Sequence, residues 1–459
     1  MGAIITLCVL GILVLYLGLF KAKNALLPVT LLGLALAFGL TIASWDTSAA
    51  PIFHGMVRFD TFALSFSLLC IFITALILLL SKEYFRSISD NVAEYYCLLL
   101  FSLTGALLVC SYHNFAMLFI GIEIMSVALY VLVGIRKNDL HGNEAALKYF
   151  LMGAFSTGFL LFGITLLYGA SGTFDLAGLA TYVSSTDSLS PLFYAGLLLL
   201  LCGLCFKIGA APFHFWTPDV YDGAPILITA FMSTVVKIAS FVAFLRLFSM
   251  VFIPVTEVWT PVLLTIVVIT LFVGNISALM QSSFKRMMAY SSIAHAGYML
   301  FSLVALSGSS ATSLFTYATA YALASIIAFG VLILVKRETG SDHFESFNGL
   351  GKRKPWLAAV LTLAMLSLAG IPLTAGFMGK FMMFNQVMQT SNIILLLLAV
   401  VNAAIGVYFY LRVVIHMYFK DSDQAFAWKT PLSYKVVFAI AALLTLITGI
   451  YPDCIIAFL

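Results

Sequence analysis

Charged side chains are scarce in this sequence. Asp, Glu, Lys and Arg make up 9% of its 459 residues, whereas a soluble domain carries about 25%. Hydrophobic residues account for 63%, and the mean hydropathy is +1.10. This balance excludes an ordinary soluble protein and predicts an integral membrane protein with little mass outside the bilayer.

Motifs for energy-yielding chemistry are also missing. The sequence has no nucleotide-binding loop, no haem motif and no cysteine cluster for an iron–sulfur centre. Cys202 and Cys205 have the spacing of a metal or redox pair, but no histidine or carboxylate in their apolar helix completes a site, which favours helix packing. We expect no metal and no catalytic redox group here, so the driving energy must come from a partner or an ion gradient.

Long apolar runs dominate the chain, and they lack the alternation of β-strands. They predict an all-α polytopic membrane protein with about fourteen transmembrane helices. The predicted spans are 3–20, 25–45, 61–81, 95–112, 115–135, 145–169, 191–217, 226–249, 259–280, 287–307, 311–335, 356–386, 391–418 and 433–451.

The loops carry their positive charge on one side. Of the 23 Lys and Arg residues, five lie within predicted spans, two (Arg58 and Arg246) fall in one set of alternating loops, and the remaining sixteen fall in the other set. Loops rich in Lys and Arg stay in the cytoplasm. We therefore expect both termini on the outer, periplasmic side. The formal charge of +4 is a topology signal and gives no reason to expect a nucleic-acid partner.

Proline interrupts two of the predicted spans. In the seventh, Pro212 follows Lys207, and in the twelfth, Pro372 precedes Lys380 by about two turns. Proline removes a backbone donor and breaks the helix. Corresponding broken helices mark the centre of transporters built from repeats, although two prolines can also coincide with lysines by chance.

Spans 4–8 and 9–13 would place these breaks equivalently in two five-helix repeats. Because five is odd, consecutive repeats enter the membrane from opposite faces and are inverted. No linker interrupts the chain, so we predict one membrane domain over 1–459. Its parts are three N-terminal spans (1–90), a first repeat (91–250), a second repeat (251–420) and a C-terminal span (421–459).

Four ionisable residues lie deep within the predicted spans: Lys207, Lys237, Lys380 and Glu123. A charge at this depth costs at least ~2.5–3.5 kcal/mol, which makes each a functional candidate. A buried lysine can load and release a proton, whereas arginine stays charged. The row of lysines with one carboxylate therefore predicts a proton path.

Further polar residues extend this prediction. Lys148 lies roughly one turn into the sixth span, where it can pair with Glu123 and lower the cost of burying both, or else extend to the cytoplasmic headgroups. His295 can relay protons between the lysines or serve as a hydrogen-bonded core residue. A third set follows Lys207 and is either a channel mouth or an ordinary loop: His214, Asp219 and Asp222.

Three stretches resemble the antiporter-like membrane subunits of respiratory complex I, the NADH:quinone oxidoreductase. They are Glu144–Ser156 (EAALKYFLMGAFS), Phe206–Pro225 (FKIGAAPFHFWTPDVYDGAP) and Lys285–Tyr298 (KRMMAYSSIAHAGY). The resemblance covers nearly the whole chain. It implies fourteen helices, two inverted repeats and a half-channel around each broken helix. One paralogous group of these subunits typically carries glutamate at the position of Lys380. Lysine there, together with the end of the chain after the last span, points to a different, bacterial group of the family.

Carried over position by position, the resemblance implies proton-path roles for the residues already singled out: Glu123, Lys148, Lys207, Lys237 and Lys380. It implies a non-redox subunit of a proton-pumping enzyme in the bacterial inner membrane. Flavin (FMN), iron–sulfur clusters and quinone are expected in partner subunits. Other membrane subunits of the complex, including the antiporter-like subunit M and the small subunit K, are the expected partners besides the lipid bilayer. The alternatives are a cation/proton antiporter subunit of the Mrp type, built on the same fold, and a subunit that merely links its neighbours.

Overall fold

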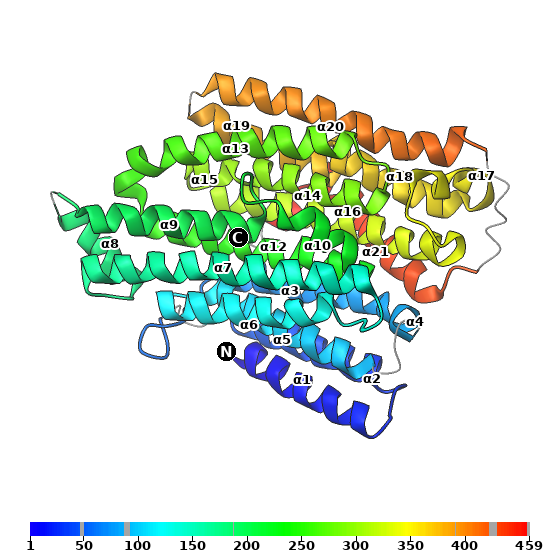
Figure 1. The fold of residues 1–459 in the computed structure, drawn as a ribbon, viewed down its shortest axis with the longest axis horizontal. Coiled ribbons are helices and arrows are strands. Elements are labelled where there is room, and N and C mark those ends of the chain that lie inside the picture. The colour runs from blue at the N-terminus through cyan, green and yellow to red at the C-terminus, as the bar shows by residue number, and fades with distance from the viewer. Residues whose placement is uncertain (46–49, 87–91, 187, 391, 422–428, 457–459) are drawn as a thin grey trace. The chain divides into compact units, whose positions relative to one another are not determined.

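A computed structural model describes residues 1–45, 50–86, 92–186, 188–390, 392–421 and 429–456 (Figure 1). Over these ranges, thirteen helices are long and apolar enough to cross a membrane. The one remaining predicted span, the twelfth (356–386), is broken and forms two shorter helices, α18 (Pro355–Ala369) and α19 (Ala375–Gln389). The all-α, fourteen-span prediction is confirmed, with most boundaries within a few residues.

The chain forms two compact units, and each is described by itself. Unit 1 comprises residues 1–75, 85–216 and 235–265. Its helices are α1 (Gly2–Leu19), α2 (Leu26–Ala43), most of α3 (Thr61–Leu79), α5 (Val92–Ser111), α6 (Phe115–Val133), α7 (Leu140–Ser171), α8 (Leu176–Ser185), α9 (Pro191–Ile208), α12 (Lys237–Met250), η2 (Ile253–Val255) and the first part of α13 (Thr256–Leu279). Helix α5 packs against α6, α6 against α7 and α7 against α9, while α12 packs against α5 and α9.

Unit 2 comprises residues 76–84, 217–234 and 266–459. Besides the rest of α13, its helices are most of α4 (Ser81–Arg86) and α10 (Trp216–Gly223), α11 (Ile226–Phe231), the start of η1 (Met232–Val236), α14 (Phe284–Met299), α15 (Phe301–Ala305), α16 (Ser310–Thr339), η3 (Phe344–Phe347), α17 (Leu350–Arg353), α18, α19, α20 (Ile393–Phe419), α21 (Leu432–Ile450) and α22 (Asp453–Ile456). Helix α16 is the centre of this unit and packs against α14, α18, α19 and α21. The fourfold division of the chain made from the sequence stays a prediction.

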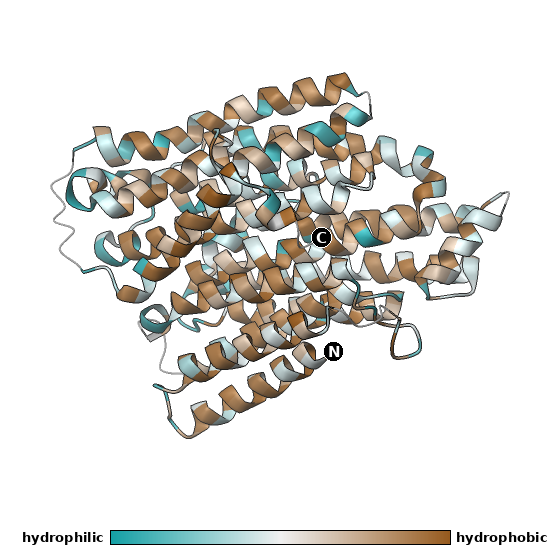
Figure 2. Ribbon diagram, turned by 180° about the vertical axis from the view of Figure 1, so that it is seen from behind, coloured by the Kyte–Doolittle hydropathy of each residue, from teal (hydrophilic) through white to brown (hydrophobic). Residues whose placement is uncertain are grey.

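Hydrophobic residues run along the helices in both units, and hydrophilic residues gather mainly at helix ends and in connecting loops (Figure 2). Many large apolar side chains are exposed, among them Phe155, Ile394 and Leu443. In water such exposure would be unfavourable. Around a helical bundle in lipid it is expected, because acyl chains are as apolar as leucine.

Both predicted helix breaks are present. Helix α9 ends at Ile208 and the chain resumes a helix at Trp216, beyond Pro212; α18 ends at Ala369 and α19 starts at Ala375, beyond Pro372. Each first half ends on a left-handed glycine, Gly209 with φ 71° and Gly370 with φ 83°. Glycine is the usual residue for this C-terminal cap because it has no Cβ to clash.

Candidate functional site

Lys207 lies in the last turn of α9, at the first break. Its side chain is buried, and its Nζ donates hydrogen bonds to Ser126 Oγ on α6 (3.2 Å) and to Thr157 Oγ1 on α7 (3.3 Å). The ammonium is thus held by two neutral hydroxyls, which favour the charge without fixing it through a carboxylate contact.

Glu123 lies one turn before Ser126 on α6, on the same side of the helix. It interacts electrostatically with Lys207. Its Oε1 atom is buried and has no hydrogen-bond partner among the described residues. A carboxylate oxygen in this state is costly, so the charge of Glu123 depends on a nearby cation or on water.

Lys148 has a different partner from the one that the sequence suggested. Its Nζ lies 2.8 Å from Glu144 Oε1, one turn earlier on α7, and both side chains are well exposed (42% and 61%). The expected ion pair was with Glu123. A lysine and a glutamate four residues apart on one helix are neighbours by geometry, and their exposure agrees with the alternative in which Lys148 extends toward the headgroups. Its part in a proton path stays a prediction.

Lys237 is the first residue of α12 and is 3% exposed. The helix that carries it is irregular, because a π-helical turn, η1, separates α11 from α12. Such turns are rare and are frequently found at functional sites. Within unit 1, α12 packs against α5 and α9, and the lysine is as deeply buried as the sequence predicted.

Lys380 lies one turn into α19, and its side chain reaches back to the second break. Its Nζ donates a hydrogen bond to the carbonyl of Ala369 (2.8 Å), the last residue of α18, and lies 5.2 Å from the centre of the Tyr298 ring. Cations are attracted to the face of an aromatic ring. Lys207 belongs to the last turn before its break, whereas Lys380 follows its break and its ammonium reaches back to the last carbonyl of α18.

Close packing of glycine brings the two halves of the second broken helix together. A Cβ on Gly376 would lie 1.8 Å from the Ser367 carbonyl oxygen, so no other residue fits there without movement. The Gly376 amide donates to Ser367 Oγ (3.1 Å). This contact holds the start of α19 beside the end of α18, and so defines the position of the Lys380 ammonium.

His295 lies between two tyrosines of unit 2. Its Nδ1 is 2.7 Å from the Tyr317 hydroxyl and its Nε2 is 3.0 Å from the Tyr410 hydroxyl. A cavity of about 10 Å³ borders His295, Tyr317, Ser367 and Gly376, which is about the size of one water. His295 therefore lies within one water of the second break, in agreement with a relay and equally with a hydrogen-bonded core residue.

The residues that follow Lys207 lie in two environments. His214 is buried in the connection between α9 and α10 in unit 1. Asp219 and Asp222 lie on α10, where Arg286 pairs with both at 3.0 Å and 3.7 Å. Paired carboxylates on a partly exposed surface fit an interfacial anchor as well as a channel mouth, so the channel-mouth role stays a prediction.

The sequence placed Lys285 and Arg246 in loops, and this placement was wrong because both residues are buried in helices. Lys285 is 2% exposed at the start of α14, where its Nζ donates to the carbonyls of Asp222 (2.5 Å) and Ala224 (2.6 Å) at the end of α10. Arg246 is 3% exposed within α12 and forms two hydrogen bonds with Asp60 (2.6 and 2.9 Å). The pattern of apolar residues did not indicate that either cation is buried. The groups that bind them lie 61 to 186 residues away in the sequence, so the local pattern does not reveal them.

Fold and site together define a class of protein: a polytopic helical membrane protein with a buried lysine at each of two broken helices, which is the antiporter-like type. A family profile described as NADH:quinone oxidoreductase/Mrp antiporter, TM, matches residues 113–406. The chain belongs to this family.

Individual relatives agree. The chain is 38% identical to NADH-quinone oxidoreductase subunit N of Flavobacterium psychrophilum over 100% of both sequences. Among solved structures, a chain of respiratory complex I from Thermus thermophilus superposes with a TM-score of 0.83 at 32% identity, covering 99% of this chain and 98% of that one. A chain of the Mrp complex from Dietzia sp. shares the fold (TM-score 0.87, covering 100% and 95%) at only 17% identity.

Proposed function

We propose that this chain is subunit N of a bacterial respiratory complex I, and that it translocates protons across the inner membrane as quinone is reduced elsewhere in the complex. The identity of 38% to a relative named subunit N supports the branch, as does lysine at position 380. Subunit N would carry no redox group itself. Flavin, iron–sulfur clusters and quinone would be bound by partner subunits, of which the neighbouring subunit M and the small subunit K are the expected contacts.

The observation that carries the proposal is the matched chemistry of the two breaks. Each unit buries a lysine beside a helix break, and each ammonium has neutral oxygen partners: hydroxyls for Lys207 and a backbone carbonyl for Lys380. Neutral partners stabilise the charged lysine less than a carboxylate contact does, so a proton can leave as well as arrive. Glu123, near Lys207, supplies a charge whose approach or withdrawal changes the protonation of that lysine.

The proposed order of transfer runs from the Glu123 and Lys207 region through Lys237 and His295 to Lys380. His295 suits an intermediate position, because a neutral imidazole donates from one nitrogen while it accepts at the other. Its two tyrosine partners allow that exchange without breaking the network. The free energy to be matched is about 4.6 kcal/mol for one proton moved against ~200 mV.

The test measures proton uptake and quinone reduction in parallel, using the complex reconstituted into vesicles. Lys207→Ala and Lys237→Ala should each strongly reduce the protons moved per electron while the complex stays assembled. Electron transfer should slow only as far as it is coupled to pumping. Full pumping per electron in both variants would refute the proton-path assignment.

An antiporter subunit of the Mrp type is the second candidate, because that fold also covers the whole chain. Purification decides between the two. A complex I subunit should copurify with a flavin- and iron–sulfur-bearing assembly. An Mrp subunit should instead copurify with other membrane subunits and support cation/proton exchange without NADH.

The proposed orientation has both termini outside. In a background that lacks the native cysteines, Glu338→Cys should react with an impermeant thiol reagent only from the cytoplasmic side. His54→Cys should react only from the outside, as both side chains are exposed. The opposite pattern would invert the topology and the direction of the path.

A further inference from the structure

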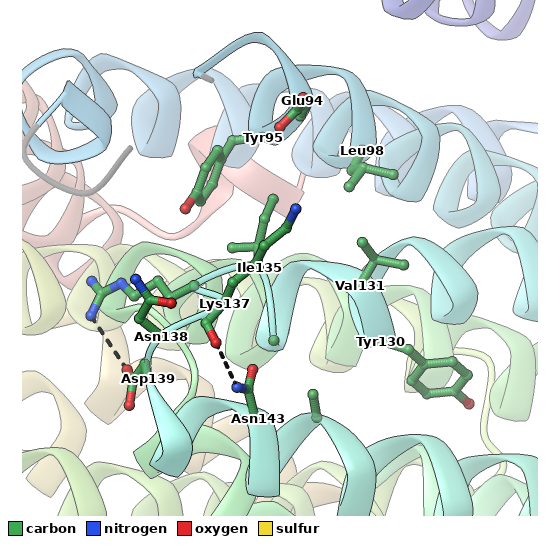
Figure 3. A pocket seen from close by; sticks show the side chains of 13 residues that line it. Glu94, Tyr95, Leu98, Tyr130, Val131, Ile135, Lys137, Asn138, Asp139 and Asn143 are labelled. Carbon is green, nitrogen blue, oxygen red and sulfur yellow. Dashed lines mark hydrogen bonds and ion pairs between the residues drawn. The ribbon is translucent and has the colours of Figure 1, made fainter. Parts of the chain in front are cut away.

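A pocket of about 990 Å³ opens in unit 1 where α5 begins, α6 ends and α7 begins (Figure 3). Its volume is at the upper end of the range for small-molecule sites. Because it lies at the ends of three transmembrane helices, it is at the level of the lipid headgroups. None of the lysines assigned to the proton path lines it.

Polar groups of both signs line this pocket. Arg136 forms an ion pair with Asp139 at 3.8 Å. Lys137 and Glu94 are both exposed, and the described residues provide neither of them with an ion pair. In Figure 3 the Lys137 side chain extends from the loop toward the side of the pocket that carries Glu94 and Tyr95. The pocket therefore presents two cationic side chains and one carboxylate that is unpaired among the described residues.

Tyr95 contributes a buried group without a partner. Its side chain is 1% exposed, and its hydroxyl has no hydrogen-bond partner among the described residues. Tyr95 lines the pocket, and its hydroxyl lies within electrostatic range of Arg136 and Glu94 but is itself covered. Buried hydroxyls are nearly always hydrogen-bonded, so a ligand headgroup that displaces the atoms covering this hydroxyl would satisfy it.

The remaining wall is partly apolar, although Asn138 and Asn143 also line it. Leu98 on α5 and Val131 on α6 line the pocket below its charged rim, and Val131 is 52% exposed on the lipid-facing side of its helix. A ligand that fits both surfaces needs a charged head joined to a hydrocarbon chain. Its head needs one anionic group for Arg136, Lys137 and Tyr95, and one cationic group for Glu94.

We propose that the pocket binds the headgroup of a zwitterionic phospholipid of the phosphatidylethanolamine type. Its phosphate lies against Lys137, Arg136 and the Tyr95 hydroxyl, its ammonium against Glu94, and its first acyl segments against Leu98 and Val131. Phosphatidylcholine fits less well because its trimethylammonium has no N–H to donate. Phosphatidylglycerol has no cation for Glu94, and soluble phosphate lacks the chains.

The test uses the full complex in nanodiscs doped with photoactivatable acyl-chain analogues of phosphatidylethanolamine, phosphatidylcholine and phosphatidylglycerol. Labelled positions on α5 and α6 are mapped by mass spectrometry. We expect labelling near Leu98 and Val131 to favour phosphatidylethanolamine by about fivefold, the size of one partly exposed charge contact. The exposed face of α1 around Val9 is the internal control and should show no headgroup preference.

Three variants assign the contacts. Lys137→Gln and Tyr95→Phe should lower phosphatidylethanolamine labelling. Glu94→Lys should reverse the preference toward phosphatidylglycerol, because it replaces the carboxylate by a cation at an exposed position where folding tolerates the change. Matched exposed controls on other helices, Lys82→Gln and Glu257→Gln, should leave the labelling ratios unchanged.

Three results would overturn the proposal. Equal labelling by all three lipids would mean annular contact only. Full competition by soluble phosphoethanolamine or inorganic phosphate would mean a soluble ligand. Recovery of a peptide from a neighbouring subunit, in place of lipid, at the labelled positions would assign the pocket to a protein interface.

Discussion

Replacing Lys380 by arginine separates a transferable proton from a fixed charge. The wild-type ammonium donates to the Ala369 carbonyl at 2.8 Å and lies over the Tyr298 ring, in a side chain that is 6% exposed. A guanidinium keeps the charge, the donor and the affinity for an aromatic face. It does not deprotonate in proteins. Lys380→Arg should therefore preserve the electrostatics of the second break while abolishing proton release from it.

Reference acidities give the size of the effect. The reference pKa of arginine is higher than that of lysine by roughly 2.1–3.4 units, or about 2.9–4.6 kcal/mol. Proton release from the same position should slow by about 100-fold or more. Pumping per electron in Lys380→Arg should fall to nearly the level of Lys380→Met.

The stability of the Met variant is expected to stay close to that of the wild type. It loses a hydrogen bond to a charged donor, worth ~1.5–3 kcal/mol, and a cation–π contact, worth ~0.5–2 kcal/mol. It also removes a buried charge that costs at least ~2.5–3.5 kcal/mol. These contributions cancel to within about 2 kcal/mol, so assembly should survive and pumping can be compared directly.

The assay follows vesicle acidification and quinone reduction together. Lys285→Arg is the matched control, because Lys285 is an equally buried lysine of unit 2 that donates to two backbone carbonyls and has no part in the proposed path. Near-normal pumping by Lys380→Arg would show that the residue acts only as a fixed charge. Equal loss in Lys285→Arg would attribute the effect to side-chain size.

Three further perturbations follow from the geometry. Glu123→Gln should reduce pumping more than Glu123→Asp, because charge near Lys207 is the property at issue, and equal effects in the two variants would assign Glu123 a structural role. Thr157→Val removes one of the two hydroxyls that accept a hydrogen bond from Lys207, and it should slow pumping several-fold in the same vesicle assay. The control is Thr165→Val, which should not slow pumping, because Thr165 is an exposed threonine on the same helix whose hydroxyl bonds to the helix backbone. Burial alone would raise the pKa of Asp342, but the hydrogen bond and charge of Lys336 outweigh burial and lower that pKa. The ion pair therefore stabilises the fold above about pH 4, and this stabilisation is lost as the pH falls through the lowered pKa. Asp342→Asn should lower the thermal unfolding temperature in detergent at pH 7, and this effect should shrink as the pH falls below about 4. A difference that stays constant as the pH falls would exclude ionisation as the cause.

The position of each buried charge in the sequence was enough to find it, but not to find its partner. A lysine inside an apolar run is visible in one dimension, which is why Lys207, Lys237 and Lys380 were predicted as buried. The contacts of Lys207 with Ser126 and Thr157 join residues 81 and 50 positions away. Side chains that far apart meet only through helix packing, and neither hydroxyl had any property in the sequence that distinguished it.

For Lys148 the sequence suggested a partner, but the structure shows a different one. Sequence proximity of the fifth and sixth spans suggested a pair with Glu123, but the rotation of α7 directs Lys148 toward Glu144 and an exposed surface. Rotation of a helix about its axis is set by which side chains pack against its neighbours. In a lipid environment an apolar sequence offers little amphipathic contrast to reveal it.

The sequence by itself determined the membrane class, the span count, the two breaks and the depth of the lysines. Lengths of apolar runs and proline positions follow from local physics: hydrocarbon thickness and the missing proline donor. Only the tertiary structure decided that Lys380 caps the carbonyl end of α18, that His295 lies between two tyrosines and that Lys285 is buried against α10. Each of these depends on directional contacts between helices distant in the chain, and such contacts exist only once the helices have packed.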